Sequence, residues 1–355
     1  MARMPLRSRI VDELTRKVSK AYEELRGLRR GKFVEGIFER VGYLTAQQIF
    51  ISNYPRRPLV AFNPSAVIED DHLHLFVRLV FDYYDYVSSI AYFDLPVSSI
   101  EDLPNLELEG RIVVYPTTQH EIKRGAEDPR AHLFDDEFLI FYTAVGLRDG
   151  GLWPKQGFTL LDKSTLETKK KGILYLGSST DPTIKLLLPS WKNTIALWRK
   201  GKKLRILTRP FIEGHEVIWR ATINAEDEWT VPYELMDVSM VHEDFEIKVG
   251  VSTPPVQISA NEYLFGWHGI GEDLIYRNGV AIVNSEGELL GISEYLLWPS
   301  TIEELYGDRP MVIYGSGLVK RGDEIFWFGG VADYGIGIYR STLDKLLETI
   351  KWIKG

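Results

Sequence analysis

The segment DHLHLFVR, residues 71–78, sets a polar turn residue before a run of mixed aliphatic and aromatic side chains. Four later segments repeat this pattern: DEFLIFYT at 136–143, KKLRILTR at 202–209, NEYLFGWH at 261–268 and DEIFWFGG at 323–330. Their first residues follow one another at intervals of 65, 66, 59 and 62. Runs of this composition are typical of β-strands. Their near-constant period indicates a fold built from similar units.

A second pattern lies eight residues before each of these segments. The five positions are Asn63-Pro64, Asp128-Pro129, Thr194 (after Lys192-Asn193), Thr253-Pro254 and Gly315-Ser316. Each unit of about sixty residues therefore holds a hairpin and enough sequence for two further strands. Five such units predict an all-β fold, a five-bladed β-propeller over residues 33–340.

The size and composition agree with a repeated fold. The 355 residues exceed the ~250–300 that one hydrophobic core holds, and blades add core without enlarging any single one. No apolar run approaches the ~18 residues of a membrane span, and the first residues lack the apolar stretch of a secretory signal. The net charge of −8 argues against nucleic acid as a partner. The absence of cysteine excludes thiolate chemistry and fits a cytoplasmic protein.

Helical patterns are expected at both ends. Residues 1–32 form an arm with ten basic and four acidic residues. Its apolar stripe comprises Val11, Leu14, Val18, Ala21 or Tyr22, Leu25 and Leu28. We expect this stripe to pack on the body or on another subunit, although a basic arm could also contact a membrane or RNA. Residues 341–355 are expected to form a C-terminal helix packed on the propeller, with leucines and isoleucines on one face.

The propeller geometry brings distant residues together. Innermost strands line the central channel, so the upstream pattern predicts a ring of Asn63, Asp128, Lys192 with Asn193, Thr253 and Gly315 at one mouth. The ends of the second strands add Arg78, Thr143, Arg209, His268 and Gly330. Such polar groups suit a polyhydroxylated ligand, whereas the plainer interpretation is that they are turn formers that satisfy backbone groups.

Asp128 is the carboxylate expected at this mouth. An inverting glycoside-cleaving enzyme needs one carboxylic acid to protonate the leaving oxygen. Hydrolysis needs a second carboxylate as base, whereas phosphorolysis needs cations that hold phosphate. Lys192, Arg78, Arg209 and His268, with Arg148 nearby in sequence, outnumber spare carboxylates. The sequence therefore favours phosphorolysis with inorganic phosphate as co-substrate, no cofactor and no metal.

At these residues the chain resembles glycoside hydrolase family 130, the mannoside phosphorylases and related mannosidases. The resembling segments include Asn63-Pro64 with Arg78, Glu127-Asp128-Pro129-Arg130, Phe141-Tyr142-Thr143-Ala144, Lys192-Asn193, Thr208-Arg209-Pro210, GVSTPP at 250–255, Trp267-His268-Gly269 and the run from Phe328 to Asp333. The chain departs from the family pattern at Thr208, where histidine is frequent, and at Ala196-Leu197-Trp198, where Phe-Pro is usual.

The resemblance implies inverting attack of phosphate on a short β-mannoside, which releases α-mannose 1-phosphate. The substrate would be a β-1,2- or β-1,4-linked mannooligosaccharide or a mannosyl-glucose. Asp128 falls on the family's general acid, whose proton passes through the sugar's 3-hydroxyl. Phosphate binding is implied for Lys192, His268 and Arg148, and substrate binding for Asn63, Arg78, Glu127, Arg130, Asn193, Arg209 and Asp333.

Two alternatives stay open: an inverting β-mannosidase on the same fold, and a non-catalytic sugar-binding propeller. The resemblance also implies that the N-terminal arm assembles a homo-oligomer. We expect no nucleic-acid or membrane partner.

Overall fold

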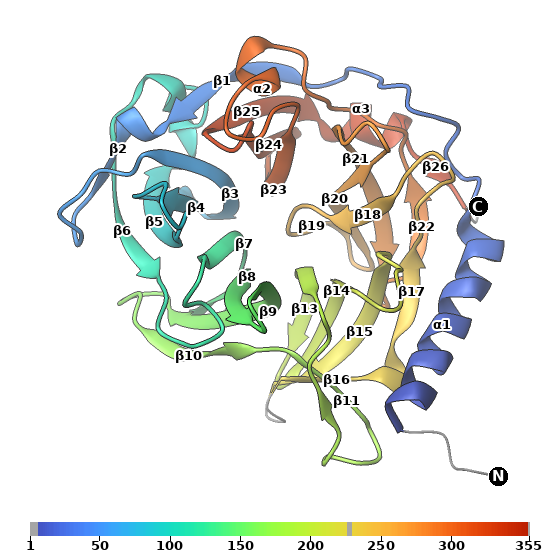
Figure 1. Cartoon of the computed structure of the whole chain (residues 1–355). Helices are drawn as coiled ribbons and strands as arrows, with labels where there is room; N and C mark the ends of the chain where they lie inside the picture. The colour runs from blue at the N-terminus through green and yellow to red at the C-terminus, as the bar shows by residue number, and fades with distance from the viewer. Residues whose placement is uncertain (1–5, 226–228, 354–355) are drawn as a thin grey trace, which may run out of the picture.

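The computed structural model describes residues 6–225 and 229–353. In Figure 1 the described chain forms twisted antiparallel blades around a central channel. The fold is the five-bladed β-propeller that the repeat predicts. The first five residues of the expected N-terminal arm and the last two of the expected C-terminal segment lie outside the described residues.

Blades 1 and 2 share one sheet. Blade 1 contains β3 (Val60–Glu69), β4 (His72–Val80), β5 (Ser88–Pro96), β6 (Leu108–Val114) and β2 (Ile49–Ile51). Blade 2 contains β7 (Gly125–Phe134), β8 (Glu137–Arg148), β9 (Gly151–Asp162) and β10 (Thr168–Ile173). A parallel bridge between Ser88 and Gly125 joins them at the channel. This bridge fixes the relative position of the two blades at the mouth where Asp128 lies.

Blades 3 and 4 have more irregular outer edges. Blade 3 contains β13 (Trp191–Lys200), β14 (Lys203–Pro210), β15 (Ile218–Asn224), β16 (Thr230–Pro232), β17 (Asp237–Met240), β11 (Tyr175–Gly177) and β12 (Lys185–Leu186). Blade 4 contains β18 (Lys248–Val251), β19 (Val256–Ser259), β20 (Glu262–Ile270), β21 (Tyr276–Asn284), β22 (Leu289–Ile292) and β26 (Lys351–Trp352). Its inner strand is interrupted, because β18 and β19 pair with successive parts of β20.

Blade 5 closes the ring with the N-terminal part of the chain. It contains β23 (Ile313–Arg321), β24 (Glu324–Val331), β25 (Gly335–Thr342) and β1 (Glu39–Thr45). β1 pairs antiparallel with β25, for example Tyr43 with Gly337. The last blade therefore joins segments about 300 residues apart in sequence, and backbone hydrogen bonds hold the ring closed.

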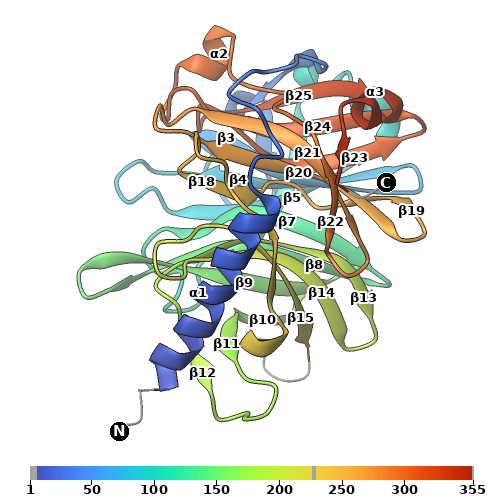
Figure 2. The ribbon, with the colours of Figure 1, turned by 90° about the vertical axis from the view of Figure 1, so that its right-hand side faces the viewer.

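Helix α1 (Leu6–Leu25) lies against blade 3 of its own chain, beside β17 (Figures 1 and 2). Ile10, Leu14, Val18 and Ala21 are buried in one core with residues of that blade. The predicted stripe is therefore right except at its start, where Ile10 is buried and Val11 is only half-buried. The expected homo-oligomer stays a prediction.

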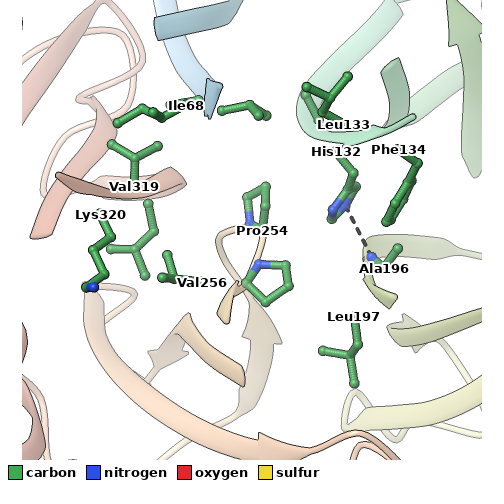
Figure 3. Close-up of a pocket in the computed structure, with 15 residues that line it drawn as sticks. Ile68, His132, Leu133, Phe134, Ala196, Leu197, Pro254, Val256, Val319 and Lys320 are labelled. Carbon is green, nitrogen blue, oxygen red and sulfur yellow. Dashed lines mark hydrogen bonds between the residues drawn. The ribbon is translucent and has the colours of Figure 1, made fainter. Parts of the chain in front are cut away.

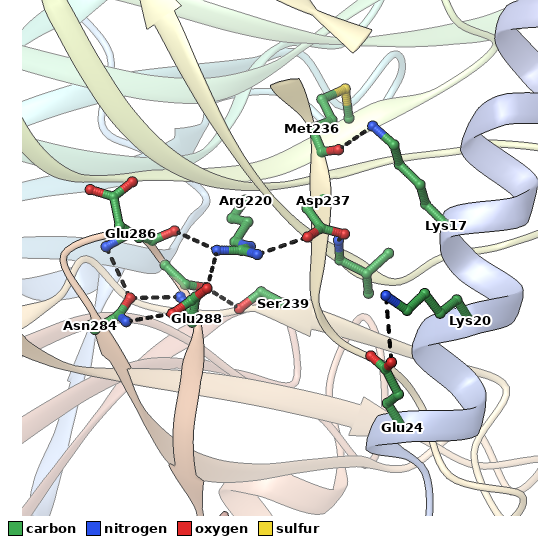
Figure 4. Close-up of polar contacts among 12 residues, drawn as sticks. Lys17, Lys20, Glu24, Arg220, Met236, Asp237, Ser239, Asn284, Glu286 and Glu288 are labelled. Carbon is green, nitrogen blue, oxygen red and sulfur yellow. Dashed lines mark hydrogen bonds and ion pairs between the residues drawn. The ribbon is translucent and has the colours of Figure 1, made fainter. Parts of the chain in front are cut away.

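Polar contacts fix α1 and the segment after it. Lys17 Nζ donates to the Met236 carbonyl oxygen at 2.7 Å (Figure 4). Beyond the helix, the buried Arg29 guanidinium donates to Glu246 at 2.6 Å, and its charge lies over the Trp267 ring at 4.4 Å. The N-terminal arm is thereby anchored behind the strand that carries His268.

The C-terminal helix is shorter than expected. Helix α3 covers only Leu343–Glu348, and β26 then pairs with β22. The backbone amide of Ile353 donates to Leu290 O at 2.8 Å. The edge of blade 4 offers backbone hydrogen bonds to residues 351–353, and these override the helical periodicity that the sequence continues to Ile353. A second short helix, α2 (Ile302–Leu305), precedes blade 5.

The central channel has a cavity at each mouth. All inner strands start at the mouth that carries Asn63 and Asp128, which we call the upper mouth. The lower mouth, where the same strands end, holds a cavity of about 300 Å³ (Figure 3). Its lining is mostly apolar and includes Ala66, Ala131, Ala196, Val256 and Leu318.

Candidate active site

The inner strands of blades 1, 2 and 3 are distorted at equivalent positions. Asn63, Asp128 and Asn193 have φ values of 47°, 55° and 57°, in the left-handed region. At each of them a β-bulge interrupts the pairing with the second strand. A bulge redirects the side chain, and the strained backbone costs about 1–3 kcal/mol per residue. The three side chains consequently point to the upper mouth, and in blade 3 the equivalent residue is Asn193, not Thr194.

These residues line a cavity of about 250 Å³. Its described lining comprises Asn63, Arg78, Tyr86, Arg124, Glu127, Asp128, Lys192, Asn193, Arg209, Lys248, His268, Tyr276, Arg309, Val312, Tyr314 and Asp333. Six of these described residues are lysine or arginine, and three carry carboxyl groups. The cavity therefore suits a ligand with hydroxyl groups and negative charge.

Asp128 is held by hydrogen bonds from blade 1. Its Oδ1 accepts from Asn63 Nδ2 at 2.7 Å and from Arg78 Nη1 at 2.8 Å. Arg78 Nη2 also donates to Glu127 Oε1 at 2.9 Å, and Arg78 Nε donates to Ser88 Oγ at 2.8 Å. Burial opposes ionisation of Asp128, but the charge of Arg78 and the hydrogen bond from Asn63 outweigh it and lower the pKa of Asp128. Burial raises the pKa of Glu127 despite Arg78.

Asp333 is a third carboxyl group at this mouth. It follows β24 in the left-handed conformation, with φ 55°. Burial raises its pKa to about 6, and the attraction of Arg78 and Arg309 only partly offsets this. The hydroxyl of Tyr86 donates to the Asp333 carbonyl oxygen at 3.3 Å. Asp333 can therefore exchange a proton near neutral pH.

Further cations reach the cavity from blades 3 and 4 and from the loop before blade 5. Arg209 lies 3.0 Å from Glu216, while its buried Nε has no hydrogen-bond partner among the described residues. Burial and the charge of Arg209 lower the pKa of Lys248. Arg309 Nη2 donates to the Tyr276 hydroxyl at 3.0 Å. An anion here would relieve the repulsion between these cations.

His268 lies among these cations as a neutral group. Burial, followed by the charge of Arg209, lowers its pKa well below the usual value. Its Nδ1 lies 2.9 Å from Ser252 Oγ. When the serine hydroxyl donates to Nδ1, the ring proton is on Nε2 and can be donated to an anion.

Comparison with known proteins identifies the family. The family model described as beta-1,4-mannooligosaccharide phosphorylase matches residues 29–352. The chain belongs to glycoside hydrolase family 130. A β-1,2-mannobiose phosphorylase of Thermoanaerobacter sp. (strain X514) is 25% identical over 291 residues, which are 78% of this chain and 88% of the relative.

Solved structures show the same fold. The β-1,2-mannobiose phosphorylase of Listeria innocua, in complex with β-1,2-mannobiose, has a TM-score of 0.62 and 16% identity. The match covers 88% of this chain and 98% of that one. Another structure was reported with the finding that family 130 contains glycoside hydrolases that target β-1,2-mannosidic linkages in Candida mannan. It has a TM-score of 0.64 and 15% identity, and the match covers 89% of this chain and 96% of that one.

Nine of the site residues predicted for this family 130 chain line the upper cavity: Asn63, Arg78, Glu127, Asp128, Lys192, Asn193, Arg209, His268 and Asp333. Arg130 lies beneath it, where its Nη2 donates to the Tyr314 hydroxyl at 2.8 Å. Arg148 lies outside it, because the β8–β9 hairpin carries it outward to an exposed position 3.5 Å from Asp149. Thr253 and Gly315, expected in the ring, are not among the described lining residues.

Several lining residues were not predicted: Tyr86, Arg124, Lys248, Tyr276, Arg309 and Tyr314. Arg124 and Lys248 lie four and five residues before the repeat positions 128 and 253, so the repeat register could have indicated them. Tyr86 lies in the β4–β5 loop and Arg309 in the segment between α2 and β23, both outside the strand pattern that repeats, and no sequence signal indicates them.

The described residues offer neither a membrane-spanning helix nor a metal-binding cluster. No described helix has the length and apolar character that crossing a membrane requires. Within residues 6–225 and 229–353, no cluster of three or more histidine or acidic side chains could hold a metal ion. That the enzyme needs no metal stays a prediction.

Proposed function

We propose that this enzyme cleaves a short β-mannoside by inverting phosphorolysis and releases α-mannose 1-phosphate. The observation that carries the proposal is the separation of charge in the upper cavity. The Asp128 cluster (Asn63, Arg78, Glu127 and Asp128) comes from blades 1 and 2, and Lys192, Arg209 and Lys248 come from blades 3 and 4 on the opposite side of the channel. An inverting reaction needs an acid and a nucleophile on opposite faces of the sugar.

The proposed step transfers the mannosyl group from the bridging oxygen to phosphate. A phosphate oxygen attacks C1 of the terminal mannose, and the bond from C1 to the bridging oxygen breaks. That oxygen takes a proton from Asp128, relayed through the sugar's 3-hydroxyl as the family resemblance implies. Phosphate is already a nucleophile, so no carboxylate is needed on the cationic side.

Each side of the cavity has a role in this proposal. Lys192, Arg209, Lys248 and Arg309 bind and orient phosphate, and His268 donates a further hydrogen bond. Asn63, Arg78 and Asp333 hold the mannose ring. The lowered pKa of Asp128 means that its carboxyl group is ionised in the free site. Binding of the sugar must therefore raise this pKa so that Asp128 takes up a proton. The sugar displaces water from around the buried carboxyl group, and this favours the protonated form.

The name of the curated relative supports β-1,2-mannobiose as a substrate, and the family description supports a β-1,4 linkage. The decisive experiment incubates the purified protein with each mannobiose, with and without inorganic phosphate, and follows products by ³¹P and ¹H NMR. We expect α-mannose 1-phosphate only with phosphate. Free mannose formed equally without phosphate would show a mannosidase, and binding without turnover would show a sugar-binding propeller.

A further inference from the structure

A third cavity, distinct from the two in the channel, lies at the rim of blade 1, on the same face as the upper mouth. Its volume is about 460 Å³, and it is lined by the β4–β5 loop, the segment before β3 and the end of β6. The rings of Tyr54, Phe81 and Tyr115 form part of its wall. Tyr54 and Phe81 meet edge to face with centroids 4.7 Å apart, and Tyr115 is 56% exposed. Aromatic rings beside polar groups are a surface on which sugar rings stack.

One polar atom in this cavity lacks a partner. Ser89 lines the cavity and is only 6% exposed, yet its Oγ forms no hydrogen bond with the described residues. A buried hydroxyl without a partner costs about 1–3 kcal/mol. A ligand hydroxyl in the cavity would satisfy it.

The cavity adjoins the active site through a shared wall. Ser88 lines the cavity at the rim of blade 1, and its Oγ accepts the hydrogen bond from Arg78 Nε. Tyr86, two residues earlier, lines the upper cavity, and its ring stacks on Tyr83 with centroids 6.0 Å apart. The loop 81–87, FDYYDYV, therefore separates the two cavities with a row of aromatic side chains. A sugar chain that leaves the upper cavity over this loop would pass the rings of Tyr86 and Tyr83.

We propose that the cavity at the rim of blade 1, which we call the blade 1 subsite, binds distal sugar units of an oligosaccharide. The terminal mannose of the same oligosaccharide occupies the upper cavity. This inference rests on the proposed function. Tyr54 and Tyr115 stack on a sugar face, and Ser89 donates to a sugar hydroxyl. The enzyme is then adapted to chains longer than a disaccharide.

The test compares mannobiose with mannotetraose of the linkage that the enzyme accepts, at saturating phosphate. We expect kcat/KM to be about five- to ten-fold higher for the tetraose, as one or two ring contacts would give. Tyr115→Ala and Ser89→Ala should remove most of this advantage and leave kcat/KM for the disaccharide within two-fold. Phe33→Ala, which removes an exposed ring near blade 4, is the control and should change neither value.

Failure of this inference can be distinguished from failure of the proposed function. Turnover of the disaccharide without preference for the tetraose, or equal losses on both substrates in the variants, would overturn the subsite and leave the function intact. If phosphate-dependent turnover is absent, the blade 1 subsite can still be tested by measuring the affinities for mannotetraose and mannobiose by calorimetry. Tighter binding of the tetraose that Tyr115→Ala and Ser89→Ala abolish supports the subsite, and equal affinities overturn it.

Discussion

The two mouths of the channel are lined by the same five inner strands, yet they differ in chemistry. Asn63, Asp128 and Asn193 occupy one repeat position at the upper mouth. Three residues later in the same strands, Ala66, Ala131 and Ala196 line the lower mouth. The upper cavity is rich in charge, whereas Figure 3 shows mainly aliphatic side chains at the lower one.

The backbone differs in the same way. None of the described residues that line the lower cavity has a positive φ, whereas five that line the upper cavity do: Asn63, Tyr86, Asp128, Asn193 and Asp333. A left-handed residue that is not glycine is unfavourable, so its recurrence at one mouth indicates selection for the direction of the side chain. The repeated inner strands line both mouths, but the strained bulges direct polar side chains only into the upper cavity.

The largest expected effect tests the acid at the upper mouth. Asp128→Asn should lower the rate of phosphorolysis about 10²- to 10⁴-fold, because an amide cannot supply the proton. The fold should be kept, since asparagine tolerates a positive φ and its oxygen can still accept from Asn63 and Arg78. Initial rates of mannose 1-phosphate release and thermal unfolding check both statements.

The matched control for this change lies at the far end of the same hairpin. Asp136→Asn alters an exposed aspartate in the turn between β7 and β8 and should leave the rate unchanged. If Asp128→Asn remained active, the proton would come from another group, and Asp333 is the next candidate because its raised pKa allows it to hold one.

Asp333 also makes the stability of the upper mouth depend on pH. The folded protein holds this proton up to a pKa of about 6, because burial penalises the charged form, whereas an ordinary aspartate releases it near 3.8. Stability from this group is present at low pH and is lost as pH rises through 6. Asp333→Asn does not titrate, so the wild-type protein should lose about 2 kcal/mol relative to it between pH 4.5 and pH 7.5. Urea unfolding without ligand at both pH values measures this, and a constant difference would contradict it.

The repeat accounts for most of what the sequence could predict. It indicated the inner strands and brought together Asn63, Arg78 and Asp128, which form direct hydrogen bonds although they lie up to 65 residues apart. This works because equivalent positions of a propeller converge on one axis.

Residues outside the repeat could not be placed in this way. Arg148 is near the site in sequence, but pairing of β8 with β9 continues to Arg148 and Gly151, so the hairpin extends past the mouth. Arg309 reaches the cavity from an irregular segment after α2, whose conformation depends on tertiary contacts. The helical spacing of the C-terminal apolar residues continues to Ile353, and only the neighbouring edge of blade 4 shows that a strand replaces the helix after Ile350.

The smallest expected effect compares two buried histidines, one at each mouth. His132 lines the lower cavity, where its Nε2 accepts from the Ala196 amide at 3.2 Å, and burial with the charge of Arg130 lowers its pKa to about 3. His268 is equally neutral but lies among the upper cations. His268→Gln should raise the KM for phosphate about ten-fold, as loss of one hydrogen bond to a charged group would, with a smaller change in the KM for the sugar.

His132→Gln is the matched variant at the lower mouth. It should leave both KM values within two-fold, and its effect should be confined to the melting temperature, because its described contacts are a backbone amide and the rings of Phe134 and Phe141. Steady-state kinetics with phosphate and sugar varied in turn separate the two variants. Equal increases in both KM values for His268→Gln would make that residue a structural support. A raised phosphate KM for His132→Gln would mean that the apolar mouth communicates with the site, and the functional distinction between the two mouths would then fail.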